Sequence, residues 1–134
     1  MSAQSRKGAS FERVMADWFR DRLGDDRIDR RVKRGAKDTG DIAGLRTIRG
    51  GKIVAEVKNR ARMDLAGWVD EAEAERGNDD ALIGVVVHKR KGVGDPSQQY
   101  VTMTAESLAL LIEGGFDDRP VFAEKDSTRI GVTR

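Results

Sequence analysis

Three residues in the middle of the chain carry side chains suited to metal-assisted hydrolysis: Asp41, Glu56 and Lys58. Glu56 and Lys58 lie two residues apart in the segment IVAEVK, residues 53–58, so the two-residue period of a strand places both on one face. Carboxylate oxygens are hard donors that suit Mg²⁺ or Mn²⁺. A neighbouring ammonium group suits an attacking water or the negative charge that develops on a phosphate. These residue types therefore indicate metal-dependent chemistry on a phosphate, provided that Asp41 lies close to the strand.

The element that must bring Asp41 to this strand is a β-hairpin. Residues 42–48 and 53–58 are rich in strand-forming residues and flank the pair Gly50-Gly51, which predicts a two-residue turn. In the register that this turn sets, Asp41 lies opposite Arg60 on the neighbouring strand. The hairpin thus places Asp41 on the correct face but beyond the end of the motif.

The distance between the two carboxylates depends on that register. With a flat hairpin, Asp41 lies about 13 Å from Glu56 along the strand, at roughly 3.3 Å per residue, which is too far for one ion. A bend or bulge at Gly40 or Gly44 would shorten the distance, and so would a register that pairs Asp41 with Glu56. The sequence leaves these alternatives open.

The surrounding pattern predicts a small α/β domain that spans residues 1–134, with residues 1–6 flexible and residues 114–134 ambiguous. A helix is expected from an N-cap at Ser10, and Gly77 is expected to follow the end of a second helix. The predicted elements, in chain order, are a helix over 10–23, a weak strand over 28–34, the hairpin strands, a helix over 64–76, strands over 82–87 and 99–103, a helix over 104–112 and a strand near 121–122.

The composition excludes several classes of site. The 134 residues include no cysteine, which rules out disulfide scaffolds, thiolate metal sites and cysteine nucleophiles. One histidine, His88, rules out sites that need two imidazoles. No apolar stretch is long enough to span a membrane, and the N-terminal residues lack the apolar region of a signal peptide. We therefore expect a cytoplasmic protein without a membrane partner.

The charge of the chain is unevenly distributed. The net charge is only +2, but residues 1–62 hold 17 basic and 9 acidic side chains, whereas residues 63–134 hold 8 basic and 14 acidic ones. The densest basic stretch runs from Arg27 to Lys37. One-sided positive charge attracts a phosphate backbone, because each neutralised phosphate releases condensed counterions. A solvated basic face with no partner is the alternative interpretation.

The hairpin residues resemble the catalytic motif of the PD-(D/E)xK nuclease superfamily. In this sequence the motif is Asp41 followed by Glu56-Val57-Lys58, with Gly40 where the motif usually has proline. A second segment, Lys7-Gly8-Ala9-Ser10-Phe11-Glu12-Arg13, is similar to the K-G-x-x-x-E-R start of the archaeal-type Holliday-junction resolvases. The resemblance covers residues 7 to about 88 in order and spacing.

This resemblance implies a restriction-endonuclease-like fold, with a central mixed β-sheet flanked by helices, and a homodimer that nicks opposite strands of a four-way DNA junction. It further implies a Mg²⁺ cofactor, which Mn²⁺ would replace, bound by Asp41, Glu56 and the carbonyl of Val57, with Glu12 completing the site. Lys58 would position the water and stabilise the phosphate. Because proline is not a ligand, the change to Gly40 is expected to matter little to the chemistry. Such an enzyme would suit an archaeal or phage-type system of DNA recombination and repair.

The DNA itself is expected to meet basic side chains around this site rather than a recognition helix, since charge dominates the sequence. We expect the following residues to contact phosphates: Arg6, Lys7, Arg30, Arg31, Lys33, Arg34, Lys37, Arg60 and Arg62. No nucleotide cofactor is expected, since Gly92-Val93-Gly94 lacks the lysine and hydroxyl of a phosphate-binding loop. The dimer surface is not identified, although Leu108, Leu111, Ile112 and Phe116 are candidates.

Three other functions fit the same sequence. A second nuclease of the superfamily would cut duplex or single-stranded DNA, and a non-catalytic module on the same fold would bind DNA without cutting it. In a third case the basic half binds an acidic protein. A separate alternative for Glu56 and Lys58 is an ordinary exposed pair on one strand face, worth less than about 1 kcal/mol.

Several other conspicuous residues have simpler interpretations. Trp18 and Trp68 lie at helical spacing with apolar neighbours and are expected in the core rather than in base stacking. His88 ends an apolar strand and is expected to be structural. The acidic side chains of the second predicted helix are expected on its solvated surface: Asp70, Glu71, Glu73 and Glu75.

Overall fold

The computed structural model describes residues 3–32, 35 and 37–114, and its centre is a five-stranded mixed sheet. Strands β3 and β4 are parallel, and the other neighbouring pairs are antiparallel, so the predicted α/β class with a mixed sheet is confirmed. The elements are α1 (Ala3–Leu23), β1 (Asp29–Arg30), β2 (Ile42–Ala43), β3 (Ile53–Lys58), α2 (Leu65–Asn78), β4 (Ile83–His88), the 3₁₀ turn η1 (Pro96–Gln98), β5 (Tyr100–Thr102) and α3 (Ala105–Glu113). The strands follow one another across the sheet in chain order.

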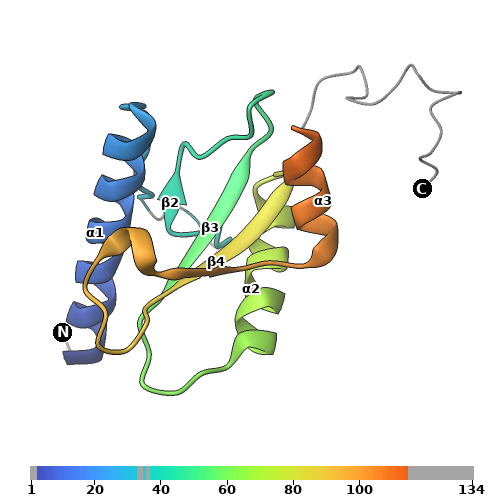
Figure 1. Ribbon diagram of the computed structural model, residues 1–134. Helices are drawn as coiled ribbons and strands as arrows, with labels where there is room; N and C mark the ends of the chain where they lie inside the picture. The colour runs from blue at the N-terminus through green and yellow to red at the C-terminus, as the bar shows by residue number, and fades with distance from the viewer. Residues whose placement is uncertain (1–2, 33–34, 36, 115–134) are drawn as a thin grey trace, which may run out of the picture.

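Helices cover both faces of the sheet (Figure 1). Phe11 and Met15 of α1 pack against Ala55 and Val57, which point to one side of β3. On the other side, Trp68 and Ala72 of α2 pack against Val86 of β4. The central strands are therefore buried on both faces, as parallel strands usually are.

Helix α1 is longer than predicted. It begins at Ala3, so the expected N-cap at Ser10 is wrong, and residues 3–6 continue the helix rather than forming a flexible lead. No proline interrupts this stretch, and a single glycine, Gly8, is tolerated inside a helix at a modest cost. The earlier start places Lys7 on the same helix as Glu12 and the buried Phe11 and Met15.

The hairpin loop differs from the predicted two-residue turn. The Thr47 amide donates to the Gly51 carbonyl at 2.8 Å, so the loop consists of Ile48, Arg49 and Gly50. Gly50 has φ +94°, the left-handed conformation that closes three-residue hairpin loops. The loop is thus one residue longer than predicted and begins earlier in the chain.

Strands β2 and β3 pair in the register that sets Asp41 near Glu56, not in the register that sets it opposite Arg60. Ile42 lies opposite Ala55, and an isolated bridge joins Arg46 to Lys52. Ile42 and Arg46 are four positions apart, whereas their partners are three apart, so the first strand carries one extra residue between the two pairs. Extended by one position, this register sets Asp41 opposite Glu56.

Gly40 shapes the loop that enters β2. Its φ is +96°, and a Cβ atom added there would lie 2.7 Å from Val54 Cγ1 and 3.3 Å from the Ala55 carbonyl oxygen. Its amide donates to Asp38 Oδ1 at 3.0 Å. Proline has φ near −65° and no amide hydrogen, so it fits neither feature. The expectation for Gly40 concerns only the chemistry, whereas the structure shows that glycine at this position matters to the backbone.

The second half of the chain follows the prediction closely. The Asp64 side chain caps α2 by accepting from the Gly67 amide, and Thr104 caps α3 by accepting from Ser107. Helix α2 includes Gly77 and ends at Asn78, because the left-handed residue that turns the chain toward β4 is Asp80, with φ +52°. Of the strand predicted over residues 28–34, the described residues 28–32 form only Asp29–Arg30, and residues 33–34 lie outside the described chain. The strand predicted near residues 121–122 lies outside the described residues.

We expect Gly40→Ala to lower the free energy of unfolding by more than about 1 kcal/mol, because alanine at positive φ is strained and its Cβ would meet Val54. Gly77→Ala is the matched control, since nothing lies within 4 Å of a Cβ at this helical position. It should raise the stability by roughly 0.5–1 kcal/mol. Urea unfolding measures both changes, and equal effects of the two substitutions would contradict the prediction.

Candidate functional site

The loop before β2 is held against the sheet by Asp41. This residue is buried, its amide donates to the Ala55 carbonyl at 2.9 Å, and its carbonyl accepts from the Arg31 amide at 2.8 Å. Its carboxylate Oδ2 accepts from the Val57 amide at 2.8 Å. The side chain of Asp41 thereby pairs with the backbone of β3 just beyond the short β2. The structure brings Asp41 to the Glu56-Val57-Lys58 motif, with its carboxylate on the amide of Val57.

Glu56 and Lys58 lie on the face of β3 that α2 covers. Both side chains are 8 % exposed, and Lys58 Nζ lies 3.2 Å from Glu56 Oε2 and 2.8 Å from Glu71 Oε1. Burial lowers the pKa of Lys58, but the ion pairs with Glu71 and Glu56 outweigh it and the net shift is upward. Lys58 is therefore a cation held in a mostly enclosed position, and the interpretation of Glu56 and Lys58 as an exposed surface pair is wrong.

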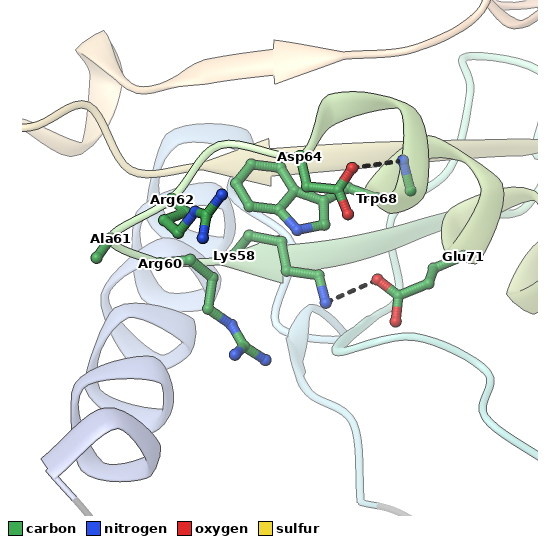
Figure 2. Close-up of a pocket in the computed structure, with 8 residues that line it drawn as sticks. Lys58, Arg60, Ala61, Arg62, Asp64, Trp68 and Glu71 are labelled. Carbon is green, nitrogen blue, oxygen red and sulfur yellow. Dashed lines mark hydrogen bonds and ion pairs between the residues drawn. The ribbon is translucent and has the colours of Figure 1, made fainter.

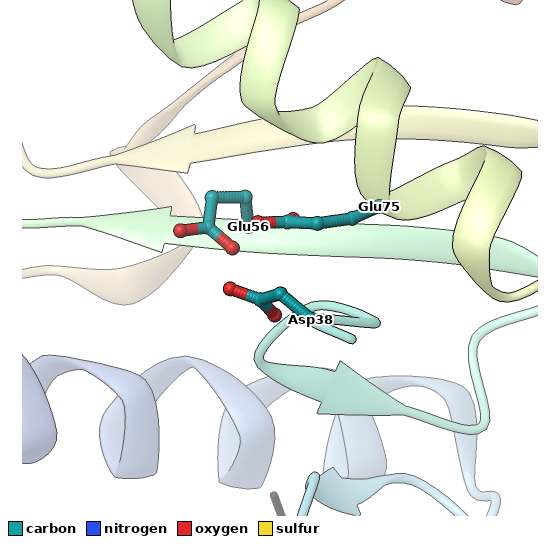
Figure 3. A group of neighbouring side chains, drawn as sticks. All are labelled: Asp38, Glu56 and Glu75. Carbon is teal, nitrogen blue, oxygen red and sulfur yellow. The ribbon is translucent and has the colours of Figure 1, made fainter. Parts of the chain in front are cut away.

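Glu56 also belongs to a cluster of three acidic residues. Oxygen atoms of Asp38, Glu56 and Glu75 lie within 4.8 Å of one another. Glu56 comes from β3, Glu75 from α2 and Asp38 from the loop before β2, and their carboxyl groups converge (Figure 3). Asn78 of α2 donates to the Asp38 carbonyl at 2.9 Å and so ties this loop to the helix. Three elements thus meet at one acidic cluster.

The cluster is electrostatically unfavourable as it stands. As whole residues, Glu56 and Glu75 are 6 % and 4 % exposed, and the Oε1 atom of each has no hydrogen-bond partner. Burial raises the pKa of Glu56 to about 7, and the negative charge of Asp41 adds to this shift. Burial likewise raises the pKa of Glu75 to about 10, with further contributions from Glu56, Asp38 and Asp41. Buried carboxylate oxygens without partners are the groups that a bound divalent cation would satisfy.

The donor set fits the ion that the sequence suggests. Mg²⁺ and Mn²⁺ prefer carboxylate oxygens, and no sulfur or imidazole ligand is needed. Asp38, Glu56 and Glu75 offer such oxygens, and Asp41 lies next to them, close enough to raise the pKa of Glu56 and Glu75. The cluster therefore adds two candidate ligands, Asp38 and Glu75, to the predicted pair.

Sequence reasoning missed Asp38, Glu71 and Glu75. Glu71 and Glu75 were assigned to the solvated surface of the second helix, but Glu75 is buried and Glu71 is paired with Lys58. The signal was available in the helical period, since Glu75 lies three and seven residues after the buried Ala72 and Trp68 and therefore on the same face. Asp38 carried no such signal, because its position depends on the loop around Gly40.

Glu12 and the predicted basic stretch form internal ion pairs. Arg30 Nη2 lies 3.2 Å from Glu12 Oε1, and Arg31 Nη2 lies 3.2 Å from Asp79 Oδ2. The structure thus joins Glu12 to Arg30, while the three-acid cluster is formed by other residues. Lys33 and Arg34 lie outside the described residues, and Arg6 and Lys37 are exposed.

A pocket of about 620 Å³ opens beside Lys58, at the carboxyl end of β3 (Figure 2). Arg60 and Arg62 line it together with Lys58, and Asp64, Trp68 and Glu71 form the side that belongs to α2 and its cap. Of the predicted DNA-binding residues, Arg60 and Arg62 thus border the candidate site directly. Lys7 lines an adjoining groove that also contains Arg60.

The aromatic residues are mostly structural, as predicted. Trp68 of α2 is buried against Val86 of β4. Trp18 of α1 is half-buried against the core beside Phe19. His88 is buried, its Nε2 lies 2.7 Å from Thr102 Oγ1, and burial lowers its pKa. These contacts support a structural role for His88.

Among the described residues, none of the helices has the length and apolar character needed to cross a bilayer. Comparisons with protein-family models, with curated proteins and with solved structures give no match.

We expect the stability of the protein in EDTA to fall as the pH rises from about 5 to 8. Glu56 and Glu75 have ordinary pKa values of 4.5, and both values are higher in the folded protein. The unfolded chain therefore releases these protons at lower pH, so their contribution to stability is complete below pH 4.5 and is lost as the pH rises. Thermal denaturation across this range measures the slope.

Glu75→Gln should make this slope shallower and raise the melting temperature at pH 8, since glutamine carries no charge into the cluster. Glu73→Gln is the matched control on the same helix, because Glu73 pairs with Arg76 at 2.9 Å on the partly exposed side. An unchanged slope in Glu75→Gln would show that burial of this carboxyl group does not govern the pH dependence.

Proposed function

We propose that this protein is a metal-dependent DNA endonuclease that acts on four-way junctions. The observation that carries the proposal is the position of Glu56. Its Oε2 atom lies 3.2 Å from Lys58 Nζ, and its carboxyl group also belongs to the acidic cluster with Asp38 and Glu75. One strand thus supplies both a metal ligand and a buried cation. The junction as substrate rests on the resemblance of residues 7–13 and the hairpin motif to the resolvases.

In this proposal the acidic cluster binds Mg²⁺, which on binding supplies Lewis-acid activation of water and neutralises charge on the phosphate. Glu56, Glu75 and Asp38 hold the ion, with Asp41 adjacent. Asp41 also fixes the Val57 backbone through its hydrogen bond. Lys58 orients the attacking water and stabilises the negative charge that develops on the phosphate oxygens as the bond to the leaving oxygen breaks. Glu12, paired with Arg30, positions the basic loop rather than the ion.

Glu71 gives the resting site a counter-ion for Lys58. The pair is close, at 2.8 Å, but Glu71 is 51 % exposed while Lys58 is 8 % exposed. A phosphate that enters the pocket of Figure 2 competes with Glu71 for the ammonium group. The ion pair therefore keeps Lys58 charged and in place until the substrate replaces Glu71.

The fold and the oligomer are part of the same proposal. Two features support the restriction-endonuclease-like fold. The motif residues lie on the hairpin of β2 and β3, and helix α2 connects β3 to the parallel strand β4. A homodimer is supported by the exposed apolar side chains of α3, Leu108, Leu111 and Ile112. Phe116, the fourth candidate for this surface, lies outside the described residues. Two copies would place two sites at a fixed spacing, which suits paired nicks.

The test is cleavage of a labelled four-way junction, a matched duplex and a single strand, with Mg²⁺ or with EDTA. We expect paired nicks in the junction that disappear with EDTA and fall by about 10²–10³ in Lys58→Ala, the loss typical of a group that stabilises the transition state. Lys52→Ala is the control, since Lys52 precedes the same strand but pairs with Asp79 at 3.5 Å. It should cleave as the wild type does.

Other outcomes would change the assignment. Cleavage of all three substrates would keep the site but make the protein a general nuclease. DNA binding without metal-dependent cleavage would contradict the catalytic proposal and leave a binding module. Equal loss in Lys58→Ala and Lys52→Ala would show that the effect is structural rather than catalytic.

A further inference from the structure

A second groove, of about 750 Å³, adjoins the Lys58 pocket. The two hollows share Arg60 and Ala61 in their linings, and they adjoin beside the carboxyl ends of the parallel strands β3 and β4. Ligands of α/β proteins commonly bind at this edge of a sheet. The groove is lined by Lys7 from α1 and by residues of the segment that follows β4.

The charge of this groove has one sign. Its lining includes five cations and, among the described residues that form it, no aspartate or glutamate: Lys7, Arg60, Lys89, Arg90 and Lys91. The basic residues near β1 are ion-paired with carboxylates, as Arg27 is with Asp25 and Arg31 with Asp79. Within the described chain, none of the five groove cations forms such a pair. Unlike Arg27, Arg30 and Arg31, whose charges are paired, these five cations are available to a negatively charged ligand.

The groove also contains an aromatic surface. The Tyr100 ring is 55 % exposed, and the Arg90 guanidinium carbon lies 4.4 Å from its centroid. Arg90 is itself held by hydrogen bonds, with its amide 2.6 Å from Gln99 Oε1 and Nη1 3.1 Å from the Gln98 carbonyl. The buried His88 ring lies in an edge arrangement with Tyr100, with 6.1 Å between the centroids and 71° between the ring planes. Tyr100 and the guanidinium over its ring thus form a partly exposed stacked pair among cations.

We propose that this groove binds unpaired nucleotides of the DNA strand that continues from the cleaved phosphate. Cations that follow a backbone and an aromatic ring on which bases stack are the two features of single-strand binding sites. In a duplex the base faces are already stacked, so an aromatic surface inside a groove adds affinity only for unpaired bases. Because the strand must reach Lys58 through Arg60, this inference rests on the proposed nuclease function and specifies its substrate as branched DNA with unpaired nucleotides beside the cut.

The experiment measures binding by fluorescence anisotropy in EDTA, where no cleavage occurs. The probes are a labelled fork with unpaired arms, a single-stranded oligothymidine and a fully paired, blunt-ended duplex of two strands. We expect the wild type to bind the fork and the single strand more tightly than the duplex. Tyr100→Ala should weaken binding of the fork and the single strand by about fivefold or more, the lower end of the effect of one stacked base, and change duplex binding less than about twofold. Tyr100→Phe keeps the ring and should bind all three probes as the wild type does.

A charge variant tests the groove independently of the aromatic ring. Lys91→Ala should weaken binding and reduce the slope of log affinity against log salt by about one, whereas Arg22→Ala removes an exposed charge at the other end of α1 and should have no effect. Wild-type affinity in Tyr100→Ala, or equal losses on the fork and the duplex, would overturn the proposal.

The two proposals fail in different ways. If metal-dependent cleavage is absent but Tyr100 and Lys91 control single-strand binding, the nuclease function is wrong and the groove stands. If the protein cuts junctions while Tyr100→Ala and Lys91→Ala bind and cut normally, the groove is wrong and the nuclease function stands.

Discussion

The hydrogen bond from the Val57 amide to the Asp41 carboxylate is the contact on which the candidate site depends. Strand β2 contains only two residues, so the ladder of backbone hydrogen bonds to β3 ends early, and a buried amide on β3 needs another acceptor. Asp41 supplies it with its side chain. Because this bond fixes the end of the loop, Asp38 is carried to the same edge of the sheet as Glu56 and Glu75.

The acidic cluster opposes the stability of the fold. Two buried carboxyl groups with raised pKa values and partnerless oxygens cost free energy that a pair of apolar residues would not. The surrounding structure tolerates this cost because both faces of β3 and β4 are covered by helices. Lys58 compensates part of the charge of Glu56, and Glu71 in turn neutralises Lys58 from the solvent side.

The sequence predicted the elements better than their registers. Alternation in residues 53–58 and the helical period after Asp64 were sufficient to locate β3 and α2 and to place Glu56 and Lys58 on one face. The hairpin loop was misjudged because two adjacent glycines favour a two-residue turn, whereas only Gly50 adopts positive φ and Gly51 pairs with Thr47. The sequence did not indicate that arginines of the basic stretch are ion-paired, because pairs such as Arg31 with Asp79 join residues far apart in sequence. Such pairs depend on tertiary contacts that no local pattern reveals.

Gly40, which has a positive φ, connects two acidic residues at this edge of the sheet, Asp38 and Asp41. Its amide donates to Asp38 Oδ1, and its turn leads directly into Asp41. A proline in this place would remove the donor to Asp38 and would not fit the positive φ, so the loop that carries Asp38 would take another path. How many carboxyl groups converge at this edge of the sheet thus depends on a residue that has no side chain. A related chain with proline at this position would need a different loop before β2 and a different donor for the Asp38 carboxyl group.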